Sequence, residues 1–288
     1  MVIAPESTVP AYRAGALVDE LAQLARTLAA PLRSYAILGE GNVSARDDEA
    51  TFWVKVSGAA MATAMASALV RVDLGRVLAL VHGPPERDEA IATALGEART
   101  DGTTGRPSVE TGMHAVLLVE AGARWIAHTH PTPLVAVLCS AHAEALVAGA
   151  LFPDQVVVCG PHPLFLPYVD PGIPLAQALS AALRAHRDRV GAAPKAVYLR
   201  NHGFVALGAS AAEVLAITDM AVKAARVLAV ALACGGPRYL SAEEVRRIAG
   251  RGDEHYRQRA LGLTPDDGVR RPGRDGRNGD GDSGDTRP

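Results

Sequence analysis

The chain has 288 residues, 49% of them hydrophobic and 21% charged, which is enough apolar sequence to bury a full-sized core and excludes global disorder. A formal net charge of −2 at pH 7 argues against a basic surface, so we expect no nucleic-acid partner. The three cysteines form neither an even set nor a C-x-x-C pair. This pattern excludes a disulfide scaffold and a cysteine zinc cluster, and it fits a reducing compartment.

The sequence shows no sign of export or membrane insertion, and we expect a cytoplasmic protein with no membrane partner. Residues 1–13 lack a basic region followed by an apolar core, unlike a secretory signal. The most apolar long stretch, residues 214–234, contains Asp219, Lys223 and Arg226 spread around a helical wheel. Each such charge costs on the order of 2.5–3.5 kcal/mol inside a bilayer. We therefore interpret this stretch as a helix packed within a soluble protein or at a subunit interface.

Hydrophobic periodicity predicts helices and strands that are mixed along the chain. We expect helices over residues 17–29, 108–121, 175–187, 211–233 and 242–257, and strands over residues 52–56, 125–130, 156–159 and 196–200. In the second of these helices, Ser108 is the expected N-cap and Glu110 lies in the first turn. Strands with covering helices indicate a layered α/β domain.

The chain shows no internal repeat and no clear linker, so we expect one domain over residues 10–263. Residues 265–288 hold six Gly, six Asp and five Arg, with Val269 as the only apolar side chain apart from the prolines. Such a segment cannot bury enough surface to offset its ordering entropy, which predicts a disordered tail over residues 264–288. Residues 99–106 are interpreted as a mobile loop.

Three histidines stand out because they fall at the ends of predicted strands. His128 and His130 lie two residues apart, and such residues on a strand point to the same face. His202 follows the predicted strand at 196–200, and Gly203 allows a sharp turn there. Three neutral imidazoles with open coordination positions suit a catalytic Zn²⁺ site. The alternative is a set of strand-end histidines that bond to water or backbone.

A carboxylate and further polar residues could complete such a site. Glu110 is either a helix-dipole residue or a metal ligand that acts as a base when substrate displaces it. His114, one helical turn later, could ligate the metal too, although an outer-shell or structural role is favoured. Two turns, at residues 41–44 and at residues 57–58, could offer donors to an anion or could be ordinary turns.

Taken together, five short motifs resemble the class II aldolase/adducin family in their order and spacing. They are G-N-V-S at residues 41–44, S-G at 57–58, P-S-V-E at 107–110, H-T-H-P at 128–131 and N-H-G at 201–203. The resemblance covers roughly residues 12–240. It implies a three-layer α/β/α sandwich with a mainly antiparallel central sheet, and a ring-shaped homotetramer with sites between subunits.

The resemblance also implies roles for individual residues. Three of them, His128, His130 and His202, would bind Zn²⁺, or another divalent ion such as Mn²⁺ or Co²⁺. Glu110 would ligate the resting metal and then exchange protons with the substrate. The phosphate of a ketose 1-phosphate would be held by Asn42, Ser57, Gly58 and Ser108. Cleavage of a carbon–carbon bond would leave an enediolate that the metal stabilises, giving dihydroxyacetone phosphate and an aldehyde.

Two departures from the family pattern leave the substrate open. Val109 stands where aldolases commonly have a second serine, so a hydroxy acid is an alternative to a sugar phosphate. The tyrosine acid of these aldolases has no counterpart in the stretch that follows His130; the next tyrosine is Tyr168, and Tyr239 and Tyr256 are further candidates. Decarboxylase, dehydratase and epimerase activities, and a non-catalytic interaction module like the adducin head, remain alternatives to the aldolase.

Overall fold

The computed structural model describes residues 11–100, 102 and 105–252. Their centre is a seven-stranded mixed sheet with the strand order β3-β2-β1-β4-β7-β6-β5. Every neighbouring pair is antiparallel except β5 and β6, which confirms the expected, mainly antiparallel sheet. The strands are β1 (Asn42–Arg46), β2 (Thr51–Lys55), β3 (Leu69–Asp73), β4 (Trp125–Thr129), β5 (Leu164–Leu166), β6 (Ala196–Leu199) and β7 (Gly203–Gly208).

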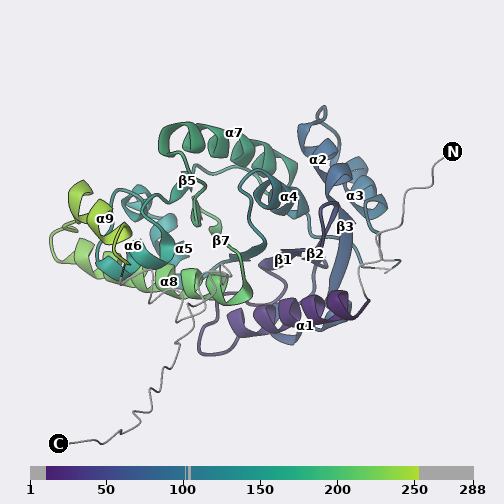
Figure 1. Cartoon of the computed structure of the whole chain (residues 1–288), viewed down its shortest axis with the longest axis horizontal. Coiled ribbons are helices and arrows are strands. Elements are labelled where there is room, and N and C mark those ends of the chain that lie inside the picture. The colour runs from purple at the N-terminus through teal and green to yellow at the C-terminus, as the bar shows by residue number, and fades with distance from the viewer. Residues whose placement is uncertain (1–10, 101, 103–104, 253–288) are drawn as a thin grey trace, which may run out of the picture.

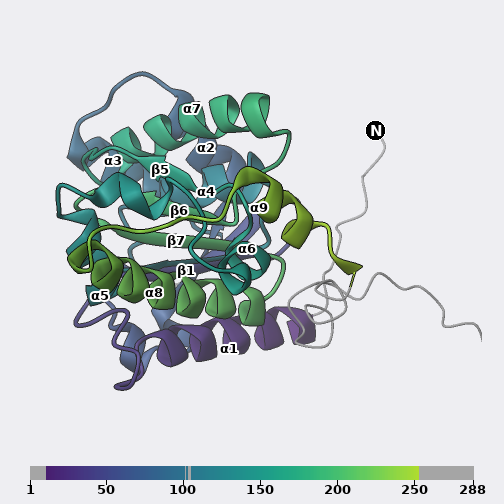
Figure 2. The same ribbon diagram turned by 90° about the vertical axis from the view of Figure 1, so that its left-hand side faces the viewer.

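Helices cover both faces of this sheet, so the domain has the three α/β/α layers that the resemblance implies (Figures 1 and 2). One helical layer contains α1 (Ala11–Leu28), α5 (Thr132–Leu138), α6 (Pro153–Cys159) and α8 (Ala211–Ala233). The other contains α2 (Leu74–His82), α3 (Asp88–Glu97), α4 (Thr111–Val119) and α7 (Ile173–Val190). A last helix, α9 (Ala242–Ala249), packs beside α6.

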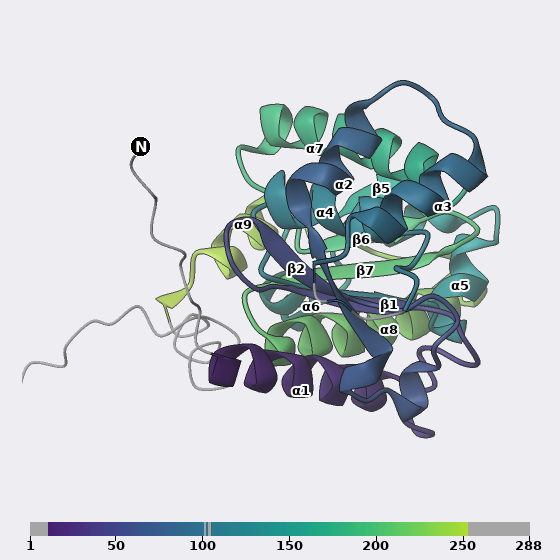
Figure 3. The same cartoon turned by 90° about the vertical axis from the view of Figure 1, so that its right-hand side faces the viewer.

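Successive side chains of a strand point to opposite faces of the sheet, which explains why two hydrophobic cores form. On β7, Phe204 and Ala206 face the layer of α1 and α8, whereas Val205 and Leu207 face the layer of α4 and α7. Both sets are buried, so the sheet is sandwiched between helices, as Figure 3 shows from the side. The central strands β1, β4 and β7 are therefore packed against helices on both faces, and this packing fixes the positions of the residues at their ends.

Most predicted elements are confirmed, but one is wrong. Residues 156–159 were expected to form a strand, and they are the end of helix α6. Pro153 occupies the first turn of this helix, a position that favours proline, and Gly160 ends it with a φ of 78°. Because α6 packs against α8, tertiary burial outweighs the strand preference of its valines.

The boundaries of several helices also differ from expectation: α1 covers residues 11–28 rather than 17–29, and α7 covers residues 173–190 rather than 175–187. Helix α4 begins at Thr111, so Glu110 is its N-cap residue and Ser108 lies before it. Helix α9 ends at Ala249, short of the expected residue 257. The predicted tail over residues 264–288 and part of the 99–106 loop lie outside the described residues. Among the helices that are described, none combines the length and the apolar character needed to cross a membrane.

Candidate metal centre

Three histidines from separate parts of the chain meet at one end of the central strands. His128 is on β4, fully buried, and pairs with Asn42 on β1. His130 follows β4 directly, and its backbone N–H donates to the carbonyl oxygen of Tyr35 at 2.8 Å. His202 lies in the tight turn between β6 and β7 and donates through its backbone to Leu199. Antiparallel pairing of β4 with β7 brings this turn beside the end of β4.

The imidazoles form a compact cluster. The ligand-type atoms of His128, His130 and His202 all lie within 4.8 Å of one another. The Nε2 atoms of His128 and His130 are 3.0 Å apart. The rings meet edge to face, with centroids 4.8 to 5.1 Å apart. This part of the sequence-based expectation, including the spatial meeting of His202 with the other two, agrees with the structure.

Outer partners fix how two of the rings are oriented. The Nδ1 of His128 lies 3.1 Å from the carbonyl oxygen of Phe204, and the Nδ1 of His130 lies 3.3 Å from a carboxylate oxygen of Glu40. Both partners can only accept, so each Nδ1 carries the proton and donates. In the neutral form that binds a metal, each of these rings directs its Nε2 lone pair at the centre of the cluster, which is the arrangement that metal-binding histidines usually show.

Glu110 completes the cluster from the start of α4. One carboxylate oxygen lies 3.3 Å from the Nε2 of His128, and the other lies 3.1 Å from the Nε2 of His202. Burial alone would raise the pKa of Glu110, but the charges and hydrogen bonds of the two histidines outweigh it and hold that pKa well below the ordinary value. Glu110 is therefore an anion at neutral pH.

Burial and neighbouring charges shift the pKa values of His128 and His130 in opposite directions. Burial lowers the pKa of His128, but the adjacent Glu110 carboxylate more than offsets this and raises it. Burial, followed by the charges of His128 and His202, lowers the pKa of His130 to about 4. The buried Glu110 carboxylate thus favours positive charge beside it, at His128, whereas His130 is held neutral.

The donor set fits a divalent cation. Three inward Nε2 atoms and one carboxylate are ligands that suit Zn²⁺ and related ions. The Oε1 atom of Glu110 is buried and has no hydrogen-bond partner among the described residues, although it lies near His202. A cation between these groups would satisfy that oxygen and would supply the positive charge that the carboxylate favours.

His114 lies apart from the three imidazoles. Its Nδ1 is 2.6 Å from the Ser44 hydroxyl, and its Nε2 contacts the side-chain oxygen of Asn42. Asn42 in turn donates to Glu110 at 2.8 Å and to the Ser108 hydroxyl at 3.3 Å. Both ring nitrogens of His114 are therefore engaged by other protein groups and are not directed at the three imidazoles.

The two turns of the expected anion site differ in their surroundings. Asn42 and Ser108 are buried beside Glu110, and residues 42–44 belong to strand β1 rather than to the turn that was considered for them. Gly41 has a φ of 68°, and a Cβ there would lie 3.0 Å from the backbone oxygen of His128. Ser57 and Gly58 form an exposed turn after β2. The buried ammonium of Lys55 links the two segments by donating to carbonyl oxygens of Gly39 and Ala59.

Two site residues were missed by sequence reasoning, Glu40 and Lys55. Glu40 precedes the G-N-V-S motif, and Lys55 precedes the S-G turn. Their contacts join positions 90 and 16 residues apart in the chain, and no local pattern reveals such pairs. The candidate tyrosines are engaged elsewhere within the chain: Tyr168 bonds to Asp170 and Tyr239 to the carbonyl oxygen of Ala145. Tyr256 lies outside the described residues.

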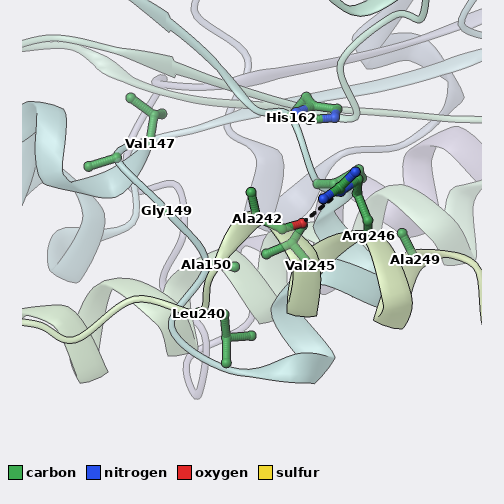
Figure 4. A pocket seen from close by; sticks show the side chains of 11 residues that line it. Val147, Gly149, Ala150, His162, Leu240, Ala242, Val245, Arg246 and Ala249 are labelled. Carbon is green, nitrogen blue, oxygen red and sulfur yellow. Dashed lines mark hydrogen bonds between the residues drawn. The ribbon is translucent and has the colours of Figure 1, made fainter.

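A cavity of about 510 Å³ lies beside α9, away from the histidine cluster (Figure 4). Its walls are mostly small apolar side chains of residues 147–150 and of α9, with His162 and Arg246 as the charged or titratable groups. Arg246 donates to the carbonyl oxygen of Ala242 in its own helix. This cavity does not share residues with the histidine cluster, and its lining carries no carboxylate.

The sequence matches a known protein family and a curated relative. Residues 19–229 match the family described as Class II Aldolase and Adducin N-terminal domain. The chain is 26% identical over 178 residues to "Uncharacterized oxidoreductase YuxG" of Bacillus subtilis; the match covers 59% of this chain and 23% of that protein. The chain thus spans about a quarter of the length of this relative.

Solved structures share the fold. The "putative aldolase/epimerase/decarboxylase" YgbL from Klebsiella pneumoniae is 25% identical, with a TM-score of 0.61, over 81% of this chain and 97% of that one. An L-fuculose 1-phosphate aldolase from Glaciozyma antarctica is 19% identical, with a TM-score of 0.60, over 90% and 91% of the two chains. At the latter identity the likeness concerns the fold alone.

Proposed function

Because the chain belongs to the class II aldolase and adducin family, we propose that it is a metal-dependent lyase that cleaves a carbon–carbon bond of a ketose 1-phosphate or a close analogue by a retro-aldol reaction. The observation that carries the proposal is the group of three inward-facing imidazoles with the Glu110 carboxylate within 3.3 Å of two of them. A purely structural cluster would not need an anion and three facing nitrogen lone pairs in one place.

In this proposal His128, His130 and His202 hold a divalent cation, Zn²⁺ or alternatively Mn²⁺ or Co²⁺. The bound cation supplies Lewis-acid stabilisation of the negative charge that develops on the substrate's oxygens. The chain's own residues set the geometry: the carbonyl of Phe204 and the carboxylate of Glu40 keep two of the rings facing inward. His128, on the central strand β4, is completely buried.

Glu110 moves the proton. When the carbon–carbon bond breaks, the hydroxyl on one fragment becomes an aldehyde and loses a proton, and the electron pair stays with the other fragment. Glu110, an anion at neutral pH, takes up one proton and delivers it to that carbon, so the overall proton balance is zero. The products are then dihydroxyacetone phosphate and an aldehyde.

The substrate's phosphate would lie against Ser57, Gly58 and Ser108. The Ser57–Gly58 turn is exposed, and Gly58 adopts a φ of 77°, which lets backbone approach a ligand closely. The buried ammonium of Lys55 lies beneath this turn and adds positive potential. The two amide hydrogens of Asn42 are directed at Ser108 and Glu110, so Asn42 supports these two residues rather than facing the phosphate.

One observation favours a second candidate, a decarboxylase acting on a hydroxy acid. Val109 is 55% exposed between Ser108 and Glu110, and it offers no hydrogen-bond donor to a phosphate at the mouth of the site. A carboxylate needs fewer donors than a phosphate dianion. An interaction module without catalysis is the remaining alternative, and it has no need for the cation ligands.

The test is incubation of the metal-loaded protein with a panel of ketose 1-phosphates, with assay of dihydroxyacetone phosphate and aldehyde. We expect cleavage of at least one member, loss of that activity after chelation, and recovery when the cation is returned. Silence across the panel together with release of carbon dioxide from a hydroxy acid would establish the decarboxylase instead. Absence of any stoichiometric divalent ion in the purified protein would favour the interaction module.

A further inference from the structure

A buried chain of hydrogen bonds runs behind Glu110, on the side away from the three imidazoles. It begins at the Ser44 hydroxyl on β1, passes through the His114 ring on α4 to the Asn42 side chain, and ends on the Glu110 carboxylate. Ser44 and His114 are completely buried, and Asn42 is 2% exposed. Polar groups buried this deeply are expected to find their hydrogen-bond partners within the protein.

The direction of every hydrogen bond in this chain follows from its acidic end. The Asn42 amide nitrogen donates to the Glu110 carboxylate at 2.8 Å, and a carboxylate oxygen is an acceptor. The Asn42 oxygen then faces the Nε2 of His114, and this nitrogen must donate. Turning the Asn42 amide over would place its oxygen against the carboxylate, an acceptor against an acceptor.

The protonation of His114 agrees with this direction. The ring is completely buried, with Nδ1 facing the Ser44 hydroxyl and Nε2 facing the Asn42 oxygen, and a neutral ring with one N–H satisfies both contacts. That proton is on Nε2, which leaves Nδ1 to accept from the Ser44 hydroxyl at 2.6 Å. Each member of the chain therefore has one consistent role as donor or acceptor.

This assignment uses both hydrogens of the Asn42 amide. One goes to Glu110, and the other goes to the Ser108 hydroxyl oxygen at 3.3 Å. The Ser108 oxygen also accepts from the backbone N–H of Glu110 at 3.3 Å. With both lone pairs occupied, the Ser108 hydroxyl can only donate to a further partner. Asn42 thus has no donor to offer an anion, whereas Ser108 has one.

We propose that Asn42 is a positioning residue for the Glu110 carboxylate rather than a ligand of the substrate anion, and that His114 and Ser44 fix its amide in the orientation this requires. The functional part of this inference rests on the proposed acid–base role of Glu110. The family resemblance implies that Asn42 binds the phosphate, whereas here Asn42 affects kcat and the anion is bound by other residues.

The orientation can be tested without any substrate. In protein carrying ¹⁵N-labelled histidine, long-range ¹H–¹⁵N spectra separate the two neutral tautomers of an imidazole, and His114→Gln identifies the signals. We expect a neutral His114 ring with its proton on Nε2 from pH 5 to pH 8. A proton on Nδ1, or a charged ring in that range, would overturn the proposal, whether or not the protein proves to be an aldolase.

The functional part is tested with a matched pair of variants. His114→Met keeps the bulk of the ring but cannot donate to Asn42, whereas His114→Gln keeps a donor. With a substrate cleaved by the wild type, we expect His114→Met and Asn42→Ala to lower kcat about 10- to 100-fold, with KM within twofold and one cation still bound per chain. His114→Gln should recover most of the loss in kcat.

Two outcomes would contradict the proposed role. A raised KM for the phosphorylated substrate in Asn42→Ala, with kcat unchanged, would return Asn42 to the anion site. Equal losses in His114→Met and His114→Gln, at equal resistance to urea, would show that ring volume rather than the donated hydrogen bond is what matters. If no substrate is found, the tautomer measurement alone decides the orientation.

Discussion

The Glu110 carboxylate has two proposed roles, in cation binding and in proton transfer, and these roles can be separated by experiment. The imidazoles of His128 and His202 lie within 3.3 Å of its oxygens, but three histidines remain to hold a cation if its charge is removed. We therefore predict that Glu110→Gln retains one bound cation per chain but loses most of its turnover. Metal analysis and initial rates on the same sample check this, and near-normal turnover would remove Glu110 from the catalytic role.

Gly203 is a residue whose missing side chain makes room for the cation ligands. A Cβ at this position would lie 2.5 Å from the Cδ2 of His130 and 2.7 Å from the backbone oxygen of Thr129. Both contacts are far shorter than real Cβ contacts, so His130 would have to move. We predict that Gly203→Ala weakens cation binding at least 10-fold, as measured by competition with a chelating dye, because misplaced ligands cost affinity on about this scale.

Gly96 on α3 provides the matched control. A Cβ there meets nothing within 4 Å, and alanine in a helix is favoured over glycine by roughly 0.5–1 kcal/mol. Gly96→Ala should leave cation affinity unchanged and slightly raise resistance to urea. Equal cation affinity in Gly203→Ala and Gly96→Ala would mean that the His130 ring is not where the cation binds.

At this scale the sequence predicted which residue types gather, but not how they contact one another. The H-x-H spacing at 128–130 and the strand-end position of His202 indicated a cluster, and the resemblance to the family selected these three residues as its members. The link between Glu40 and His130 was not, because its two members come from a loop and a distant strand end. The roles of Asn42 and His114 depend on the direction of donor and acceptor atoms, which only the assembled chain defines.

At the scale of elements, the junction between α4 and β1 depends on a neutral histidine. Burial lowers the pKa of His114 to about 3, compared with 6.5 for an exposed histidine. Between these two values the unfolded chain binds a proton that the folded chain does not, so folding stability falls as the pH is lowered from about 6.5 towards 3. From pH 7.5 to pH 5 this residue should cost about 2 kcal/mol of unfolding free energy.

Urea unfolding of the wild type and His114→Gln at several pH values isolates that contribution. The difference between the two proteins should change in this range by about the stated amount, with the wild type losing more stability at low pH. A constant difference from pH 7.5 to pH 5 would mean that His114 titrates normally and that the junction is open to water.

The long helices and the strands β2, β4 and β6 were predicted, whereas β3, β5, β7 and the shorter helices α2, α3 and α5 were not, for physical reasons that differ between helix and strand. Long helices such as α7 and α8 repeat their apolar residues over many turns, so their periodicity is clear. Helix α6 has only seven residues, three of them consecutive valines, and a run so short is equally compatible with a strand. Strand β1 was not predicted as a strand because its glycine and asparagine are also typical of turns.

At the scale of the molecule, the connection between α1 and β1 exposes apolar side chains beside the candidate metal centre. Leu32 is 98% exposed and Leu38 is 85% exposed, and Glu40 of the same connection contacts His130. Exposed apolar groups of this size are typical of interfaces. In keeping with the family, we propose a homotetramer in which this connection faces a neighbouring subunit.

Sedimentation velocity tests the assembly. We predict a mass about four times the 29.9 kDa of the chain, and a smaller species for Leu38→Asn. Asparagine suits this position because residue 38 has a φ of 51°, which asparagine tolerates better than leucine does. The substitution should thus remove apolar surface without straining the loop. A wild type that sediments as a monomer would contradict the proposed tetramer.

The central claim is that His128, His130 and His202 bind one divalent cation together. Its most direct test is a crystal of the full chain grown with Co²⁺ or Zn²⁺, with anomalous scattering measured at the absorption edge of the ion. We predict one peak per chain, at about 2.0–2.1 Å from the Nε2 atom of each of the three histidines. A peak bound elsewhere, or one that the ring of His202 does not reach, would contradict the account.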